Sequence, residues 1–107
     1  MGAPAIDDAV LAPVLAAYAI RGARARGVLG ASNRNDNLLV VDATGARYVL
    51  RRYRRNPDAR RVESQVRFQQ HLRRHGFPTA EVVETRVGTC SVLSEDGLPW
   101  VLFTHGG

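Results

Sequence analysis

The sequence predicts an α+β domain in which a mainly antiparallel sheet of about five strands carries one packed helix and a further N-terminal helix. Two observations predict this class. Two segments that follow aspartates repeat apolar residues at helical spacing. Short strand-like runs lie between and after them, separated by glycine-containing turns, and strands joined by such turns pair in antiparallel fashion.

The predicted elements run in the order helix, three strands, helix, then two or three strands. The first helix is expected to begin at Asp7 or Asp8 and to end before Gly22. The second begins near Pro57, a residue that suits the first helical position, and ends at Gly76. The strand candidates lie at 24–29, 37–42, 47–54, 82–86, 89–93 and 100–104, with a loop at 30–37.

Composition narrows the function classes. The 107 residues, 45% of them hydrophobic, suffice for one small domain. All 15 basic residues are arginines, which excludes mechanisms that need a lysine amine. The single cysteine, Cys90, excludes an internal disulfide and predicts a cytoplasmic protein. No apolar run approaches the roughly 20 residues that cross a bilayer, so no membrane contact is expected.

Four stretches in order carry a resemblance to a known family: GASNRNDN (30–37), LLVVDATGARYVLRRYRR (38–55), VESQVRFQQHLRRHGFPTAEVV (62–83) and DGLPWVLFTHGG (96–107). Together they closely resemble the N-terminal part of the aminoglycoside phosphotransferase family, which includes choline-kinase-like and homoserine-kinase-like enzymes. The resemblance implies a kinase-like nucleotide-binding lobe at 23–107 that ends at the hinge. Residues 1–22 then form an N-terminal helix, and the C-terminal catalytic lobe is expected to be absent.

The resemblance assigns roles in the first half of this lobe. Ser32 and Asn33 fall in the loop that covers the nucleotide phosphates, although an ordinary hairpin turn also explains them. Arg51 stands where the family has a third-strand cation, usually lysine, that neutralises the phosphates. Strand alternation places Val49 on the same face, over the adenine. A solvated arginine in the RRYRR cluster is the alternative reading of Arg51.

The second half of the lobe supplies the remaining nucleotide-binding candidates. Gln65 occupies the position of the family's helix glutamate and is expected to face inward and to hydrogen-bond Arg51, whereas Glu63 is expected at the surface. Phe103 would lie beside the adenine, and the backbone of Thr104 and Gly106 would form the hinge contacts. A plain buried edge strand is the alternative for this segment.

The residues that would catalyse phosphoryl transfer are not recognisable in this sequence. The family needs a catalytic aspartate and magnesium-binding residues, yet no His-x-Asp motif occurs here, and Asp36, Asp42 and Asp96 read as turn or strand-end acids. The resemblance therefore implies that ATP or another nucleoside triphosphate binds with Mg²⁺ whose ligands lie outside this chain. The expected protein is a truncated or split phosphotransferase, inactive alone, whose uncovered surface meets a missing lobe or self-associates.

An arginine-rich nucleic-acid-binding module is the alternative function. Its basis is a run of cations interleaved with Tyr48 and Tyr53, together with a net charge of +5. No nucleic-acid motif accompanies the run, and strand alternation divides its arginines between two faces. The sequence thus favours a nucleotide over a nucleic acid as the partner. The arginines concerned are Arg51, Arg52, Arg54, Arg55, Arg60 and Arg61.

Overall fold

The computed structural model describes residues 8–31, 35–54 and 58–105. Within these ranges the strands form one sheet in which every pairing is antiparallel, which confirms the α+β class with six strands rather than about five. The strand order is β1-β2-β3-β6-β4, and β5 also pairs with β6. The elements are α1 (Asp8–Ala16), β1 (Arg24–Ala31), β2 (Asn35–Val41), β3 (Arg47–Tyr53), α2 (Ala59–Arg74), β4 (Val82–Val83), β5 (Ser91–Leu93) and β6 (Pro99–Thr104).

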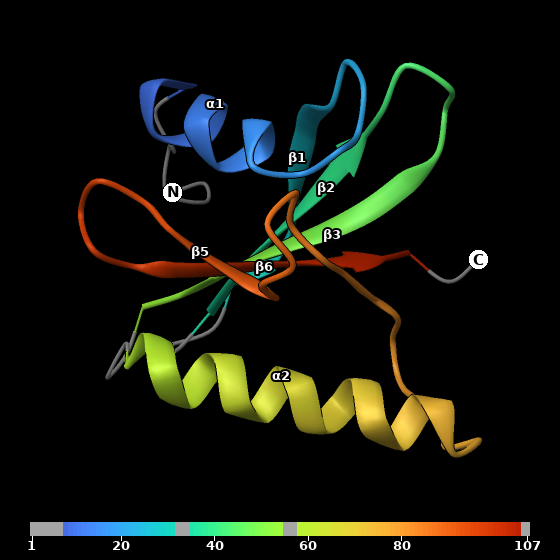
Figure 1. Ribbon diagram of the computed structural model, residues 1–107. Coiled ribbons are helices and arrows are strands. Elements are labelled where there is room, and N and C mark those ends of the chain that lie inside the picture. The colour runs from blue at the N-terminus through green and yellow to red at the C-terminus, as the bar shows by residue number, and fades with distance from the viewer. Residues whose placement is uncertain (1–7, 32–34, 55–57, 106–107) are drawn as a thin grey trace.

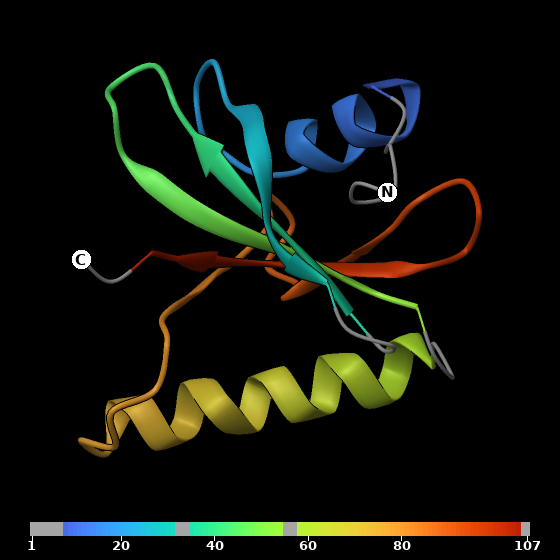
Figure 2. The ribbon, with the colours of Figure 1, turned by 180° about the vertical axis from the view of Figure 1, so that it is seen from behind.

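The sheet lies between the two helices, with α1 on one face and α2 on the other (Figures 1 and 2). Because successive strand residues point to opposite faces, the central strands contribute to two separate cores. The core on the α1 side comprises Leu11, Val14, Tyr18, Leu38, Val40, Leu50, Trp100 and Leu102. The core on the α2 side comprises Val62, Val66, Val82, Cys90, Val101 and Phe103.

Helix α1 is part of the domain core and not an appendage. Val14 and Tyr18 are fully buried in the same cluster as Trp100. The chain that follows α1 is also tied to the sheet, because the Arg86 amide donates to the carbonyl of Ala17 over 2.9 Å. The N-terminal helix thus stabilises one face of the lobe.

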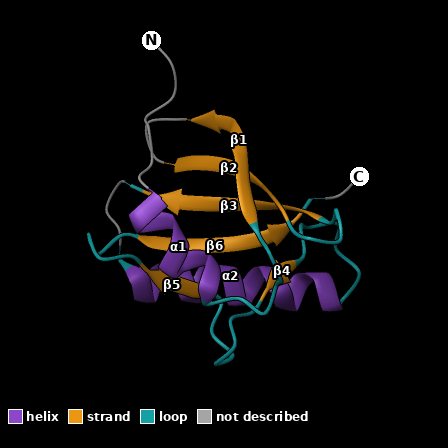
Figure 3. Ribbon diagram, turned by 90° about the horizontal axis from the view of Figure 1, so that it is seen from above, coloured by secondary structure: helices purple, strands orange, loops and turns teal. Residues whose placement is uncertain are grey.

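Helix α2 covers only part of its face of the sheet. Along β2, the residues that point to the α1 side are buried, whereas the alternate residues that point to the α2 side are only half-buried. Figure 3 shows the reason: α2 runs alongside β6, β4 and β5, while β1 and β2 extend beyond it. The α2-side surface of β2 and β3 is consequently open, and we call it the open half of the sheet.

Local signals account for the β2–β3 hairpin and the limits of α2. The Asp42 carboxylate accepts from the amides of Thr44 and Ala46, which closes the turn as expected, and Gly45 adopts φ +87° there. Asp58 caps α2 by accepting from the amides of Arg60 and Arg61.

The structure corrects the expected loop at 30–37. Strand β1 extends to Ala31 and β2 begins at Asn35, so Asp36 lies at the end of a strand and not in a turn, and it is fully buried. A carboxylate is tolerated there because Arg52 of β3 and Arg54, just after this strand, neutralise it. Strands β4 and β5 are shorter than expected and each pairs with β6. Among the described residues, no helix has the length and apolar character needed to cross a membrane.

Candidate functional site

The open half of the sheet and the neighbouring strand β6 bring together residues from three strands. In the sheet register Asn37 lies opposite Arg51, Leu39 opposite Val49, and Val49 opposite Phe103. Directly opposed residues point to the same face, so all five side chains share the α2 side. The structure therefore confirms that Val49 and Arg51 share a face and places Phe103 beside them.

Arg51 is held in place on this surface. Its Nε donates to Oδ1 of Asn37 over 2.8 Å, and its guanidinium carbon lies 5.1 Å from the centre of the Phe103 ring. Both contacts are favourable, since the ring face attracts a cation and the amide oxygen accepts from it. Arg51 is half-buried and held by these two contacts, and its role toward a nucleotide stays a prediction.

The helix partner expected for Arg51 is corrected. Gln65 is exposed, and no hydrogen bond joins it to Arg51 within the described residues. The buried arc of α2 is centred on Val62 and Val66, which turns Glu63 toward β5 and leaves position 65 facing solvent. Any contact of Gln65 with a nucleotide stays a prediction.

Glu63, expected at the surface, instead fastens α2 to β5. Its carboxylate accepts from the Cys90 amide over 2.9 Å and from the amide and hydroxyl of Ser91 over 2.9 and 2.8 Å. Partial burial opposes ionisation of this group, but the hydrogen bonds from Cys90 and Ser91 and the charge of Arg67 outweigh it and lower its pKa. Glu63 thus sets the rotation of the helix beside the open half of the sheet.

The same network encloses Cys90, which was not among the predicted site residues. Arg67 contacts Glu63 at 3.2 Å and Glu84 at 3.3 Å, and Gln70 donates to the Glu84 carboxylate. Burial of Cys90, together with the nearby Glu63 charge, raises the pKa of its thiol to about 11. The thiol is therefore protonated and inert, as suits a structural residue.

A buried ionic cluster lies on the opposite, α1 face of the sheet. Oδ2 of Asp36 contacts Nη2 of Arg52 at 2.7 Å and Nε of Arg54 at 2.8 Å, and Arg52 also lies over the Trp100 ring. Sequence reasoning missed this cluster, although Asp36 has the same strand parity as the buried Leu38. Because Arg52 and Arg54 face away from Arg51 and are offset by Asp36, the arginine run is not a single basic surface.

The described part of the predicted hinge segment is the end of β6. The Thr104 amide donates to the Glu81 carbonyl over 2.8 Å, while the next residue, His105, donates to the Arg47 carbonyl of β3. Since the N–H and C=O of a strand residue point the same way, the Thr104 carbonyl faces away from β3. Ser32, Asn33 and Gly106, the other predicted contacts, lie outside the described residues.

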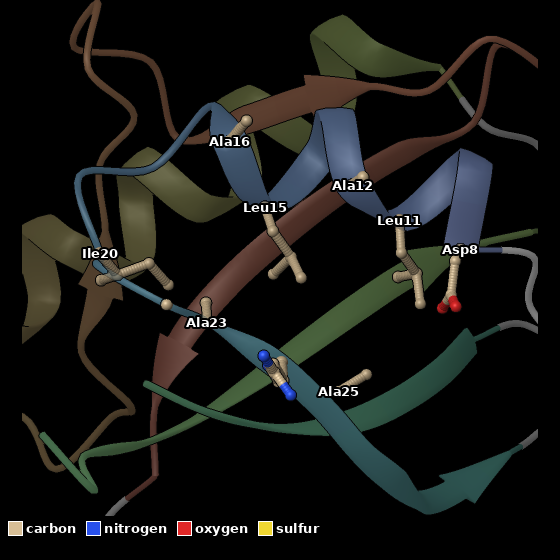
Figure 4. A pocket seen from close by; sticks show the side chains of 10 residues that line it. Asp8, Leu11, Ala12, Leu15, Ala16, Ile20, Ala23 and Ala25 are labelled. Carbon is tan, nitrogen blue, oxygen red and sulfur yellow. The ribbon is translucent and has the colours of Figure 1, made fainter. Parts of the chain in front are cut away.

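A separate pocket of about 610 Å³ lies between α1 and the start of β1, on the α1 side of the sheet (Figure 4). Its lining is mostly small and aliphatic, with Leu11, Leu15 and Ile20 pointing into it and Asp8 at one end. It does not include the residues of the open half of the sheet. Among the described residues, no group of three or more acidic, histidine or cysteine side chains is placed to hold a metal ion.

Comparison with known proteins places the chain in a family. No curated protein and no solved structure matches it. Residues 26–107, however, match the phosphotransferase enzyme family. This match covers the sheet from the third residue of β1 onward together with α2, and so includes the open half of the sheet and Arg51. The chain therefore belongs to the phosphotransferase enzyme family.

Proposed function

We propose that these residues form the ATP-binding lobe of a small-molecule phosphotransferase of the aminoglycoside phosphotransferase type. The observation that carries the proposal is the open half of the sheet, where an apolar residue and a cation of β3 lie beside a buried aromatic ring of β6. Flat apolar surface next to a fixed positive charge suits a ligand that joins a base to phosphates.

Each residue has a role in this proposal. Val49 packs against the adenine ring, Arg51 offsets the charge of the phosphates, and Phe103 limits the depth of the base site. The Thr104 carbonyl and the Gly106 amide exchange hydrogen bonds with the base, while Ser32 and Asn33 cover the phosphates. ATP or another nucleoside triphosphate is the ligand, with Mg²⁺ held by residues outside this sequence.

The proposal assigns nucleotide binding to these residues and assigns phosphoryl transfer to none of them. The 107 residues contain no His-x-Asp motif to orient an acceptor hydroxyl. We therefore expect a second lobe, or self-association, to cover the open half of the sheet. A cytoplasmic location is part of the same proposal and rests on the free, buried Cys90.

The test is a titration of the 107-residue chain with ATP and with adenosine, followed by NMR or calorimetry. We expect ATP to bind more tightly than adenosine, because only ATP engages Arg51. Arg51→Gln should weaken ATP binding by about tenfold, the value of one charge-assisted contact, and should leave adenosine binding unchanged.

Arg21→Gln is the matched control, because it removes the same charge from an exposed residue of the α1–β1 loop. It should leave both affinities unchanged. Equal binding of ATP and adenosine by the wild-type chain, or full ATP affinity in Arg51→Gln, would contradict the assignment. Phosphate transfer to small-molecule acceptors by the 107 residues alone would contradict the expected lack of turnover.

No specific observation favours the nucleic-acid alternative. Arg52 and Arg54 turn to the α1 face and are bound by Asp36, so the cations nearest the open half of the sheet are fewer than the sequence suggests. A nucleic-acid backbone needs a continuous positive surface. Among the described residues of β3, Arg47 and Arg51 point to the open half of the sheet, and they lie four positions apart along the strand.

A further inference from the structure

We propose that Asn37 is the positioning residue of the phosphate cation, in the place where a carboxylate of the neighbouring helix would act. The inference rests on the proposed function, because it concerns how Arg51 meets phosphates. It goes further in naming the group that orients this cation and in explaining why the cation is an arginine.

The contact itself is specific. Asn37 and Arg51 are directly opposed in the β2–β3 pair, and the 2.8 Å hydrogen bond uses Nε and not a terminal nitrogen of the guanidinium. The side chain of Tyr53 also lies within hydrogen-bonding reach of the guanidinium. Because Asn37 engages Nε, the terminal nitrogens are the donors through which the fork can meet a phosphate.

The Phe103 ring supplies the second constraint. The guanidinium carbon lies 5.1 Å from the ring centre, so the side chain is held both by the ring and by the amide of Asn37. A freely moving arginine side chain loses considerable rotamer freedom when it binds a ligand, which costs conformational entropy. Because two contacts already restrict Arg51 in the free protein, much of that entropy cost is removed from the binding step. The cation is therefore oriented before the nucleotide arrives.

Helix α2 does not orient Arg51. Its carboxylate, Glu63, is committed to the backbone of β5, and Gln65 is exposed to solvent. Both positions are determined by the buried arc around Val62 and Val66. The tether thus lies within the sheet and does not depend on the placement of the helix.

The inference also explains why lysine would not substitute. Lysine carries its three donors on one nitrogen, so the same ammonium would have to serve both Asn37 and the phosphates. Arginine separates the two tasks, since Nε serves the protein and the terminal nitrogens serve the ligand. Restoring the residue type usual in the family should therefore weaken binding.

The experiment is a double-mutant cycle on the 107-residue chain with Asn37→Leu, Arg51→Lys and the combination. Affinities for ATP and adenosine are measured by titration, and the exchange of the Arg51 Nε proton with water is followed by NMR without ligand. We expect each single variant to weaken ATP binding about fivefold, adenosine binding to stay unchanged, and the combination to bind no more weakly than Arg51→Lys.

The outcomes separate the inference from the function on which it rests. If the wild type binds ATP but Asn37→Leu keeps its affinity, or if the two losses multiply, the positioning role is wrong and the proposed function stands. An equal loss for adenosine would show a general distortion of the sheet and also overturn the role. The wild type could also bind no ATP although the Arg51 Nε proton is protected from exchange by Asn37. In that outcome the hydrogen bond between Asn37 and Arg51 exists, but the proposed function and the role of Asn37 in phosphate binding are both wrong. Should Asn37→Leu not fold, Arg51→Lys decides by itself, since undiminished ATP binding there overturns the inference.

Discussion

Replacing Asp36 by asparagine is the most informative perturbation of the fold. The Asp36 side chain is 1% exposed, and its Oδ2 atom is shared by Nε and Nη2 of Arg52, at 2.9 and 2.7 Å, and by Nε of Arg54 at 2.8 Å. Asp36→Asn keeps the shape of the side chain but removes the charge that offsets both cations. Removing one partner of a buried pair costs about 3–5 kcal/mol, because the other charge remains buried.

The cost here should fall below that range. The side chains of Arg52 and Arg54 are 13% and 34% exposed, so water recovers part of their solvation once the carboxylate is gone. We expect a loss of about 2–3 kcal/mol in the free energy of unfolding. With a urea dependence of about 1–1.5 kcal/mol per M for a small domain, the midpoint should fall by about 2 M.

The assay is urea unfolding of the wild type, Asp36→Asn, Arg52→Gln and the double variant. Arg52→Gln should cost clearly less in the Asp36→Asn background than in the wild type, because the pair is already broken. Glu95→Gln removes the same charge from an exposed side chain and should change stability by less than about 0.5 kcal/mol. If Asp36→Asn is as stable as Glu95→Gln, the cluster does not stabilise the sheet.

Two further predictions concern the attachment of α2. Glu63→Gln should lower the free energy of unfolding at pH 7 by about 1–2 kcal/mol, since it weakens the acceptor for Cys90 and Ser91. The native pKa of Glu63 lies below its ordinary value of 4.5. The stability that its charge contributes is therefore fully present above pH 4.5 and is lost as the pH falls through the lower native pKa. Urea unfolding at pH 7, 5 and 3 should show the stabilities of the wild type and Glu63→Gln converging. A constant difference across this range would contradict the role of the charge. Cys90, with its pKa raised to about 11, should react with a disulfide reagent at pH 8 at least about 100-fold more slowly in the native chain than in urea, and equal rates would show that the network around it is open.

Much of the fold could be predicted because its signals are local. The hairpin turn is encoded within five residues, where Asp42 closes the loop and Gly45 supplies the positive φ. Helix α2 is likewise bounded by a capping Asp58 and by Gly76 at φ +90°. The order of helices and strands follows from such signals, and the family resemblance was confirmed over residues 26–107.

The errors arose where a side chain depends on partners distant in sequence. Asp36 reads as a turn or strand-end residue beside asparagines, and its burial is explained by Arg52 and Arg54, the nearer of which is 16 residues away in the chain. The rotation of α2 was misjudged because Glu63 and Gln65 flank the apolar stripe on its two sides, and helical spacing alone does not decide which flank meets β5. The amides of Cys90 and Ser91 decide it.

For the candidate site, strand alternation was enough to put Val49 and Arg51 on one face, because side-chain direction along a strand is a property of the backbone. The sequence by itself thus determined the class of fold and the family, and it predicted the arginine that we propose as the phosphate cation. Only the tertiary structure decided that Asn37 and Phe103 hold that cation, that Glu63 serves β5, and that α2 leaves half of one sheet face open. These features are contacts between elements. They are selected by packing across the sheet, because the local pattern of one segment does not specify which residue of another segment it meets.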